Sequence, residues 1–406
     1  MTVLNPSAGN SGLAPGGRKI KVLWLCSPLA PRYGVMNIVR GWASAFDFDR
    51  FDVTFAFCSP DPDELRSRLA PFPALRLESM PELLSQNRAY IPALRSLRRL
   101  MRRERPDVVH TIFVQSDILG SFAARSSGVP VVVSSVMGYL VAPLGGGRWK
   151  VPVYKTAYRL ASRGINRVMA ITRTTGEQLV QDFGVRRERV QVVYSGVPQQ
   201  QYPRPLGSDG SMVIGSVGML IPQKGVETFV RAIPLVLAKF PAARFVIAGD
   251  GPERQNLESL AARLGVAGRL DFLGFREDVP QLMAGLDTFV FSAFPTYDGL
   301  PRVILEAMVQ RTPVVAARTT PIEEVVQQGR TGRLYTPGNA EELAAALGQV
   351  MSEPEVTSAL VEGAHQLASQ ISVEREVQQI QDTYLALLPA GRARGTGPTS
   401  GERRTS

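Results

Sequence analysis

The chain has 406 residues, which is enough for two or three domains with sizeable apolar cores. Apolar residues make up 44% and charged residues 20%, so a largely disordered chain is excluded. Its two cysteines, Cys26 and Cys58, are too few for a disulfide framework or a cysteine-rich zinc site, and they favour a reducing cytoplasm. No apolar run is long enough to span a bilayer, and no signal peptide is visible. We therefore expect a cytoplasmic protein, bound at most peripherally to the inner face of the cytoplasmic membrane.

The net charge of +10 is distributed unevenly. Residues 1–200 carry 27 Lys and Arg against 14 Asp and Glu, whereas residues 201–406 carry 19 against 22. The first half is therefore expected to face an acidic partner or to gain solubility from its charge. No helix-turn-helix, zinc-finger or RNA-binding signature is present, so nucleic acid is not expected. An anionic membrane or a phosphorylated substrate is favoured.

Apolar runs typical of buried parallel strands alternate with helical patterns along the first half of the chain. This alternation predicts a doubly wound parallel sheet with right-handed crossovers. The runs lie at 19–27, 51–59, 107–113, 129–136, 167–172 and 190–196.

A second alternating series follows a Pro- and Gly-rich linker at 197–211. Its apolar runs lie at 212–218, 243–251, 270–275, 288–294 and 312–318. Two consecutive doubly wound domains, at 19–200 and 205–372, place a cleft between the carboxyl ends of their strands. Residues 1–18 and the basic tail 391–406 are predicted to be disordered.

The sequence lacks the motifs of two common nucleotide sites, the dinucleotide-binding fingerprint and the P-loop. The first strand-to-helix turn, CSPLAPRYGVMN, lacks G-x-G-x-x-G, and Pro252 together with a missing third glycine spoils the fingerprint at Gly249. No Walker motif occurs either. Any phosphate site is therefore of another design, in the second domain.

Four blocks of the second half carry a family resemblance: GSVGMLIPQKGVETFVRA at 215–232, FVIAGDGPER at 245–254, LDFLGFREDVPQLMAGLDTFVFSA at 270–293 and DGLPRVILEAMVQRTPVVA at 298–316. In this order they resemble the retaining glycosyltransferases of the GT-B fold, family 4. The resemblance implies two Rossmann-like domains that face a cleft. The first would bind the acceptor and be completed by a C-terminal helix at 377–390, and the second would bind a nucleotide sugar.

The implied reaction moves a hexose from a nucleotide-sugar donor to a glycan or lipid-linked acceptor, with retained anomeric configuration, in cell-surface polysaccharide or glycolipid biosynthesis. No Asp-x-Asp metal pair is evident in the four blocks that carry the resemblance, so neither a metal nor another cofactor is expected. Two alternatives stay open. One is a nucleotide-sugar-binding protein with impaired catalysis, and the other is a GT-B nucleotide-sugar epimerase, for which no acid-base set is found.

Lys224 follows a predicted strand and precedes a glycine. An ammonium beside backbone N–H groups can stabilise the charge that grows on a leaving diphosphate. The resemblance places Lys224 there, although a lone lysine is more often a solvated surface residue. The family's usual arginine five residues earlier is Met219 here, and Arg302 is a candidate substitute. Gly218 and Gly274, from the same blocks, are further expected donor contacts.

Asp298 and Glu306 bracket a turn and the start of a helix. Pro301 suits a first helical turn, whose N–H groups would face the donor phosphates. The resemblance implies that Glu306 binds the ribose hydroxyls and that Asp298, shorter than the family's glutamate, contacts the transferred sugar as a catalytic residue. Alternatively, both acids are ordinary helix-terminus and surface residues. The expected donor contacts in this block are Asp298, Gly299, Leu300, Arg302, Val303 and Glu306.

Two residues of the first half are weaker candidates. Gly34 occupies the turn where the family has a Gly-Gly pair near the donor, or it is simply a turn glycine. His110 is expected at the carboxyl end of a strand, where it would be catalytic, or it is a satisfied buried imidazole. The family's further histidines correspond to Ile112 and Met137.

A basic amphipathic helix is predicted at 91–105. Its arginines could bind an anionic leaflet, each contributing about 1 kcal/mol near the surface. The alternative is a core helix with a solvated outer face. The arginines concerned are Arg95, Arg98, Arg99, Arg102 and Arg103.

Overall fold

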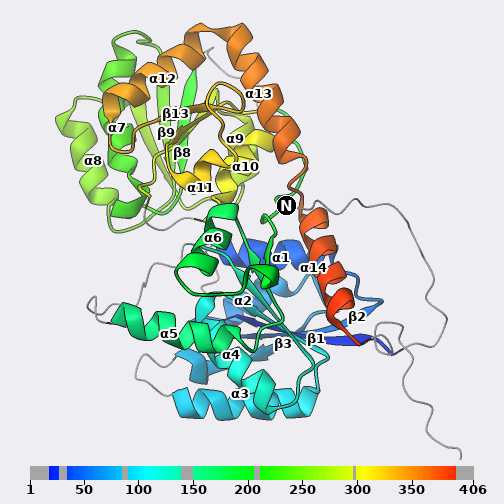
Figure 1. The fold of residues 1–406 in the computed structure, drawn as a ribbon. Helices are drawn as coiled ribbons and strands as arrows, with labels where there is room; N and C mark the ends of the chain where they lie inside the picture. The colour runs from blue at the N-terminus through cyan, green and yellow to red at the C-terminus, as the bar shows by residue number, and fades with distance from the viewer. Residues whose placement is uncertain are drawn as a thin grey trace, which may run out of the picture.

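The computed structural model describes residues 18–26, 34–84, 90–138, 150–204, 211–295 and 299–389. These residues form two α/β units, drawn one above the other in Figure 1. The segments predicted to be disordered lie outside the described residues, except for Arg18.

The lower unit in Figure 1 contains a parallel sheet of seven strands in the order β3-β2-β1-β4-β5-β6-β7. The chain runs outward from β1 in one direction, then crosses over and continues from β4 in the other, which is a doubly wound arrangement. The strands are β1 Ile20–Cys26, β2 Phe51–Phe57, β3 Arg76–Ser79, β4 Val108–Ile112, β5 Val131–Val136, β6 Arg167–Ala170 and β7 Val190–Val192.

The upper unit repeats this arrangement with six parallel strands in the order β10-β9-β8-β11-β12-β13. The strands are β8 Val213–Val217, β9 Arg244–Ala248, β10 Leu270–Gly274, β11 Thr288–Phe291, β12 Val314–Ala317 and β13 Arg333–Tyr335. The predicted fold class, two doubly wound parallel sheets, is confirmed. The outer strands β3 and β13 were not predicted, because RLES and RLY are too short and too polar to form apolar runs.

Helices cover both faces of the first sheet because its strands alternate between two apolar sets. Val22 and Trp24 belong to the core under α1 and α14, whereas Leu23 and Leu25 belong to the core under α3, α4 and α5. The helices of this unit are α1 Gly34–Ala45, α2 Pro62–Leu69, α3 Tyr90–Glu104, α4 Val114–Ser126, α5 Lys150–Ser162 and α6 Arg173–Gln181.

The second sheet is covered in the same way. Ile214 and Phe245 face the core under α7, α8 and α12, while Phe289 and Val314 face the core under α9, α10 and α13. The helices are α7 Val226–Leu237, α8 Arg254–Arg263, α9 Val279–Ala284, α10 Arg302–Val309, α11 Thr320–Glu323, α12 Ala340–Ser352 and α13 Pro354–Ala368.

The last helix, α14 (Val373–Leu387), returns to the first unit and starts four residues before its expected position. Val377 and Tyr384 are fully buried in the first core. Figure 1 shows this helix, in red, running down from the upper unit beside α1. The first core is therefore built from two parts of the chain that are far apart in sequence.

The two chain crossings between the units pack backbone to backbone. Val197 and Ser372 form a parallel β-bridge, and a Cβ on Gly196 would lie 2.2 Å from the Ser372 carbonyl. The buried Glu376 carboxylate accepts the Gly196 N–H at 2.7 Å and the Trp42 Nε1–H at 2.9 Å. Burial raises the pKa of Glu376 to about 7. This carboxylate thus joins the first crossing, the last helix and α1.

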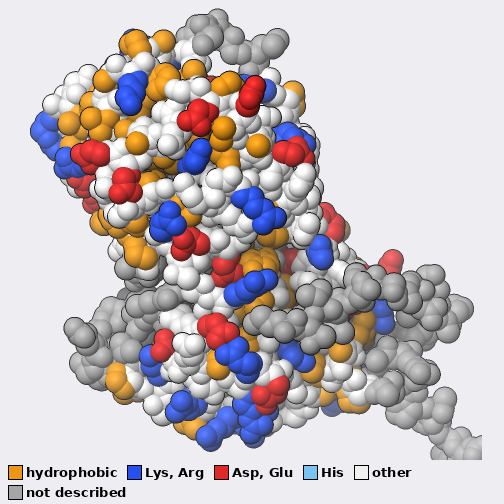
Figure 2. Space-filling model, turned by 45° about the horizontal axis from the view of Figure 1, so that its top comes forward, with side chains coloured by type: hydrophobic (Ala, Val, Ile, Leu, Met, Phe, Trp, Pro, Cys, Tyr) orange, Lys and Arg blue, Asp and Glu red, His pale blue; other side chains and the backbone are white. Residues whose placement is uncertain are grey.

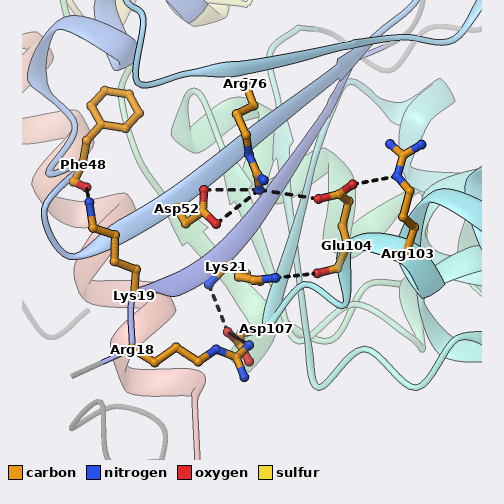
Figure 3. Close-up of polar contacts among 9 residues, drawn as sticks. All are labelled: Arg18, Lys19, Lys21, Phe48, Asp52, Arg76, Arg103, Glu104 and Asp107. Atoms are coloured by element: carbon orange, nitrogen blue, oxygen red, sulfur yellow. Dashed lines mark hydrogen bonds and ion pairs between the residues drawn. The ribbon is translucent and has the colours of Figure 1, made fainter. Parts of the chain in front are cut away.

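Ion pairs hold the amino edge of the first sheet together between β3 and β4 (Figure 3). Arg76, at the start of β3, lies 3.2 Å from an Asp52 carboxylate oxygen and 3.5 Å from one of Glu104. Asp107, just before β4, accepts the Lys21 backbone N–H at 3.0 Å. On this side of the edge, carboxylates therefore pair with the arginines, while the Lys19 and Lys21 ammonium groups donate to the backbone carbonyl oxygens of Phe48 and Glu104.

A buried carboxyl group lies under the other face of the sheet. Asp117, in the first turn of α4, accepts hydrogen bonds from three hydroxyl groups: Thr111, Ser134 at 2.7 Å and Tyr158 at 3.1 Å. Burial raises the pKa of Asp117 to about 7, and the hydrogen bonds oppose this rise. The protonated form is thus favoured in the folded protein over a pH range in which the unfolded chain is ionised.

The Asp117→Asn variant tests this buried ionisation. The folded pKa, about 7, lies above the unfolded value, so the wild type loses free energy of unfolding as pH rises from about 4 through 7. Asparagine does not titrate, and the three hydroxyls can reorient to donate to or accept from its amide. We expect the variant to gain stability relative to the wild type between pH 5 and pH 8 in urea denaturation. A difference independent of pH would contradict the buried ionisation.

Candidate active site

Two loops meet where the second sheet reverses its winding. β8 and β11 are neighbours in this sheet, and the chain leaves their carboxyl ends toward opposite sides. Open α/β sheets bind ligands in the crevice formed at such a point. Lys224 follows β8, and helix α10, which carries Glu306, follows β11. Sequence positions 82 residues apart are therefore brought to one edge of the sheet.

The Lys224 loop is fastened to the end of β11. The Ser292 hydroxyl donates to the Lys224 carbonyl oxygen at 2.9 Å, and the Lys224 ammonium lies 5.6 Å from the centroid of the Phe291 ring. Gly225 follows with φ +58°, and a Cβ there would lie 2.2 Å from the Ser292 carbonyl oxygen. Glycine is therefore required for this close approach, and the loop fixes the backbone that carries Lys224.

Glu306 lies in helix α10 with its side chain 13% exposed. Burial raises the pKa of its carboxyl group, and the charge of Arg302, whose Nε is 4.0 Å away, opposes this rise. Arg302 also donates through Nη1 to the Ser195 hydroxyl at 3.2 Å and to the Gly196 carbonyl oxygen. Its Nη1 is thus engaged with the interdomain crossing, while its Nε lies on the side of Glu306.

The remaining predicted glycines of this domain meet around Gly249. The Gly249 N–H donates to the Gly274 carbonyl oxygen at 2.7 Å, and the Gly218 N–H donates to the Ala248 carbonyl oxygen at 3.0 Å. Gly249 has φ +143°, and a Cβ on it would lie 1.8 Å from the Gly218 oxygen. The structure therefore brings Gly218 and Gly274 together at the carboxyl edge. Met219, next in the chain, is 38% exposed.

The block before α10 faces the first unit. A Cβ on Gly299 would lie 2.9 Å from the Ile171 side chain and 3.3 Å from the Met137 carbonyl oxygen. Leu300 is buried in the same apolar cluster as Ile171, and Val303 packs against it. Since Ile171 and Met137 follow strands of the first sheet, the carboxyl ends of the two sheets face each other.

For two of the predicted site residues, the described part of the chain shows no contact that supports a role in the site. Asp298 lies outside the described residues. Gly34 is the first residue of α1, and none of the described residues lies within 4 Å of the point where its Cβ would be. This position does not itself require glycine for space.

The predicted position of His110 is wrong. Strand β4 continues to Ile112, so His110 lies in the middle of the strand, fully buried. Its Nδ1 is 2.5 Å from the Tyr384 hydroxyl, its Nε2 is 2.8 Å from the Ser135 hydroxyl, and its ring stacks on Trp42 at 5.1 Å. Burial lowers the pKa of His110 to about 3. Both ring nitrogens of His110 thus have hydroxyl partners, and His110 is a core residue. The strand does not end at His110, because the apolar run continues to Ile112.

A carboxylate that the sequence did not reveal connects the two units. Glu324, directly after α11, accepts the N–H groups of Arg173 at 2.9 Å and Thr174 at 2.8 Å, which begin helix α6 of the first unit. It also accepts the Thr174 hydroxyl at 2.7 Å and the Tyr194 hydroxyl at 2.9 Å. A negative charge at a helix N-terminus is stabilised by the helix dipole. No motif in the sequence pairs Glu324 with α6.

A metal site is not formed by the described residues: no three His, Cys, Asp or Glu side chains among them come together in a way that could hold an ion. Likewise, no helix in the described part of the chain is long and apolar enough to cross a membrane.

Two family models match the chain in succession. Residues 33–196 match the glycosyl transferase 4-like domain, and residues 211–353 match the glycosyl transferases group 1. Together they cover most of both units. The chain belongs to the family 4 glycosyltransferases.

The relatives of this glycosyltransferase include enzymes named for lipopolysaccharide assembly and for sugar transfer to a lipid diphosphate, and others named for glycosylation of 2-deoxystreptamine. The lipopolysaccharide core biosynthesis glycosyltransferase LpsE of Rhizobium meliloti is 29% identical over 323 residues, covering 75% of this chain and 82% of LpsE. An Escherichia coli UDP-Gal:alpha-D-GlcNAc-diphosphoundecaprenol alpha-1,3-galactosyltransferase is 25% identical over 73% of this chain and 79% of its own length. Among solved structures, Anabaena HepE in complex with UDP aligns with a TM-score of 0.77 and 25% identity, covering 90% of this chain and all of HepE.

The Glu324→Ala variant tests the contact between the units of this glycosyltransferase. The substitution removes four hydrogen bonds to a carboxylate, and a single bond to a charged group contributes about 1.5–3 kcal/mol. We expect small-angle X-ray scattering to show a larger radius of gyration, because the units open at this contact while the crossing at Gly196 and Glu376 still joins them. Glu323→Ala is the matched control, since Glu323 pairs with Arg318 inside its own unit. An unchanged scattering profile of Glu324→Ala would show that this contact does not hold the units together.

Proposed function

We propose that this glycosyltransferase moves a hexose from a UDP-sugar to a glycan or lipid-linked acceptor in cell-surface polysaccharide or glycolipid biosynthesis, with retention of the anomeric configuration. The observation that carries the proposal is the meeting of Lys224 and the α10 block at the point where the second sheet reverses its winding. The UDP in HepE and the UDP-galactose in the name of the Escherichia coli relative support the choice of donor.

In the proposed reaction, Lys224 stabilises the negative charge that develops on the leaving diphosphate. The N-terminal N–H groups of α10 face the same phosphates, and Glu306 accepts hydrogen bonds from the ribose hydroxyls. Gly218 and Gly274 line this edge, and Asp298 contacts the transferred sugar. The acceptor oxygen bonds to the anomeric carbon as the bond to the diphosphate breaks, and the acceptor proton passes to the leaving phosphate. Attack from the leaving-group face retains the configuration and requires neither a protein base nor a metal.

A second candidate is a nucleotide-sugar-binding protein with impaired catalysis. Met219 presents an exposed thioether where the family has an arginine, and Met137 packs between the two units where the family has a histidine. Incubation with a panel of nucleotide sugars, with and without acceptor, separates the candidates. Release of nucleoside diphosphate only with acceptor supports transfer, whereas binding without release supports the second candidate.

Lys224→Ala and Glu306→Gln test the donor site. Each removes a charge-assisted contact to the donor, which should lower turnover roughly ten- to hundredfold, for about 1.5–3 kcal/mol. Lys239→Ala and Glu341→Gln are matched controls, because both side chains are exposed on the same unit. Circular dichroism should show an intact fold. Wild-type turnover in either site variant would refute the assignment, and a strict requirement for magnesium or manganese would refute metal-independent transfer.

We also propose that α3 lies on an anionic membrane. Arg95, Arg99 and Arg102 are exposed on one face of this helix, and Ile91 at its start is 65% exposed. Figure 2 shows Lys and Arg side chains gathered at the lower end of the lower unit. This arrangement of an apolar end and a basic face suits the interface of a bilayer. A peripheral position would bring the active site close to a lipid-linked acceptor.

The other two predicted arginines of α3 are less available. Arg98 is half-buried, and Arg103 pairs with Glu104 at 2.8 Å and with Glu78 at 2.9 Å. Its contact with Glu104 is drawn in Figure 3. The membrane contact therefore rests on the three exposed arginines.

The triple variant Arg95→Glu, Arg99→Glu, Arg102→Glu tests the membrane face. The wild type should co-sediment with phosphatidylglycerol vesicles and be released by salt, since the attraction decays within a Debye length of about 8 Å at physiological ionic strength. The variant should stay in solution and still bind UDP. Arg231→Glu, on the second unit, serves as a single-site control. If the wild type ignores these vesicles at low salt, α3 is a core helix with a solvated face.

A further inference from the structure

A cavity of about 460 Å³ opens at the amino edge of the first sheet, on the opposite side from the candidate active site. It lies between the end of α5, which leads into β6, and the turn before β7. Both segments enter strands at their amino ends, whereas the active site is at the carboxyl ends. The lining residues are Arg159, Ser162, Arg163, Gly184, Arg186 and Arg189. Four of these six residues are arginines.

The Arg159 guanidinium lies directly against the backbone of Gly184. Gly184 has φ +64°, and a Cβ on it would lie 2.4 Å from Nε of Arg159 and 2.5 Å from Nη2. No other residue type leaves room for the guanidinium at this place. The turn after α6 is thus shaped to receive Arg159.

Arg189 donates to backbone carbonyl oxygens that would otherwise offset the positive charge of the arginines lining the cavity. Its Nη1 donates to the carbonyl oxygens of Ser162 at 3.3 Å, Arg163 at 3.1 Å and Ile165 at 3.1 Å, at the C-terminal end of α5. The end of a helix carries a partial negative charge. Because Arg189 neutralises it, this partial charge does little to offset the positive charge of the other lining arginines, Arg159, Arg163 and Arg186.

Two of the acidic side chains near the cavity pair with cations that do not line it. Asp182 is 3.5 Å from Lys155, and Glu177 forms a two-pronged pair with Arg187, which does not line the cavity. Glu188 approaches Arg186 only to 3.9 Å, and both side chains are about 70% exposed. This differs from the other side of the same edge, between β3 and β4, where the arginines pair with carboxylates at 2.8–3.5 Å (Figure 3).

We propose that this cavity binds a phosphate group, as a second anion site separate from the nucleotide-sugar site. Guanidiniums bind phosphate oxygens through paired N–H donors, and arginines that line one cavity repel one another unless an anion lies between them. A soluble phosphate ester and a phospholipid headgroup share this chemistry. The site does not depend on the proposed donor or acceptor.

Calorimetric titration with inorganic pyrophosphate tests the site. The double variant with Arg159→Gln and Arg163→Gln should bind pyrophosphate at the cavity at least tenfold more weakly. The corresponding double lysine variant should keep part of the affinity, because the positive charge remains. Arg187→Gln is the matched control, since Arg187 is a neighbouring exposed arginine outside the cavity. Unchanged thermal unfolding of each variant confirms the fold.

The Lys224→Ala variant separates this site from the nucleotide site. Pyrophosphate binding that survives Lys224→Ala and is lost in the double glutamine variant supports the proposal. Binding that is lost in Lys224→Ala and unchanged in the double variant overturns it, as does the absence of any binding.

Vesicles identify the source of the phosphate. If the double variant also loses sedimentation with phosphatidylglycerol vesicles, and pyrophosphate competes with them for the wild type, the cavity binds a lipid headgroup. If sedimentation is unchanged while pyrophosphate binding is lost, the cavity binds a soluble phosphate.

Discussion

The relation between the two units depends on one buried carboxylate. Glu376 reaches from the last helix to the N–H of Gly196 in the first crossing and to the indole N–H of Trp42 in α1. A carboxylate placed in a protein interior is costly unless such donors meet it. Arg302 contacts the same crossing from the start of α10. The position of the donor-site helix relative to the first sheet is therefore set by polar groups at the crossing, not by the active site itself.

Much of the fold was predictable because a buried parallel strand is apolar on both faces and therefore forms a continuous apolar run in the sequence. The outer strands were not, since RLES and RLY gain their strand conformation from pairing with β2 and β12 rather than from their own residues. His110 shows a related limit. Its position in a strand was visible, but its partner Tyr384 lies 274 residues away and only the return of α14 brings them together.

The candidate site divides in the same way. Lys224 and the α10 block carry local motifs, so their place at the end of β8 and β11 could be predicted. The engagement of Arg302 with Ser195 and the contact of Glu324 with α6 join residues more than 100 positions apart, and neither leaves a local pattern. Contacts between domains depend on side chains of one domain that complement those of the other. A single sequence does not show which of these side chains meet. Met137 is an example, since a position that resembles a catalytic one serves to pack the two cores together.

The return of α14 also dictates an order of assembly during synthesis. The second unit is one uninterrupted stretch from β8 to α13, so it has all of its core residues once Ala368 has left the ribosome. The first unit begins earlier but lacks Val377, Ile380 and Tyr384 until helix α14 emerges. Until then its sheet exposes the apolar surface that α14 later covers, and such surface favours aggregation. The part of the protein that is made first is therefore completed last.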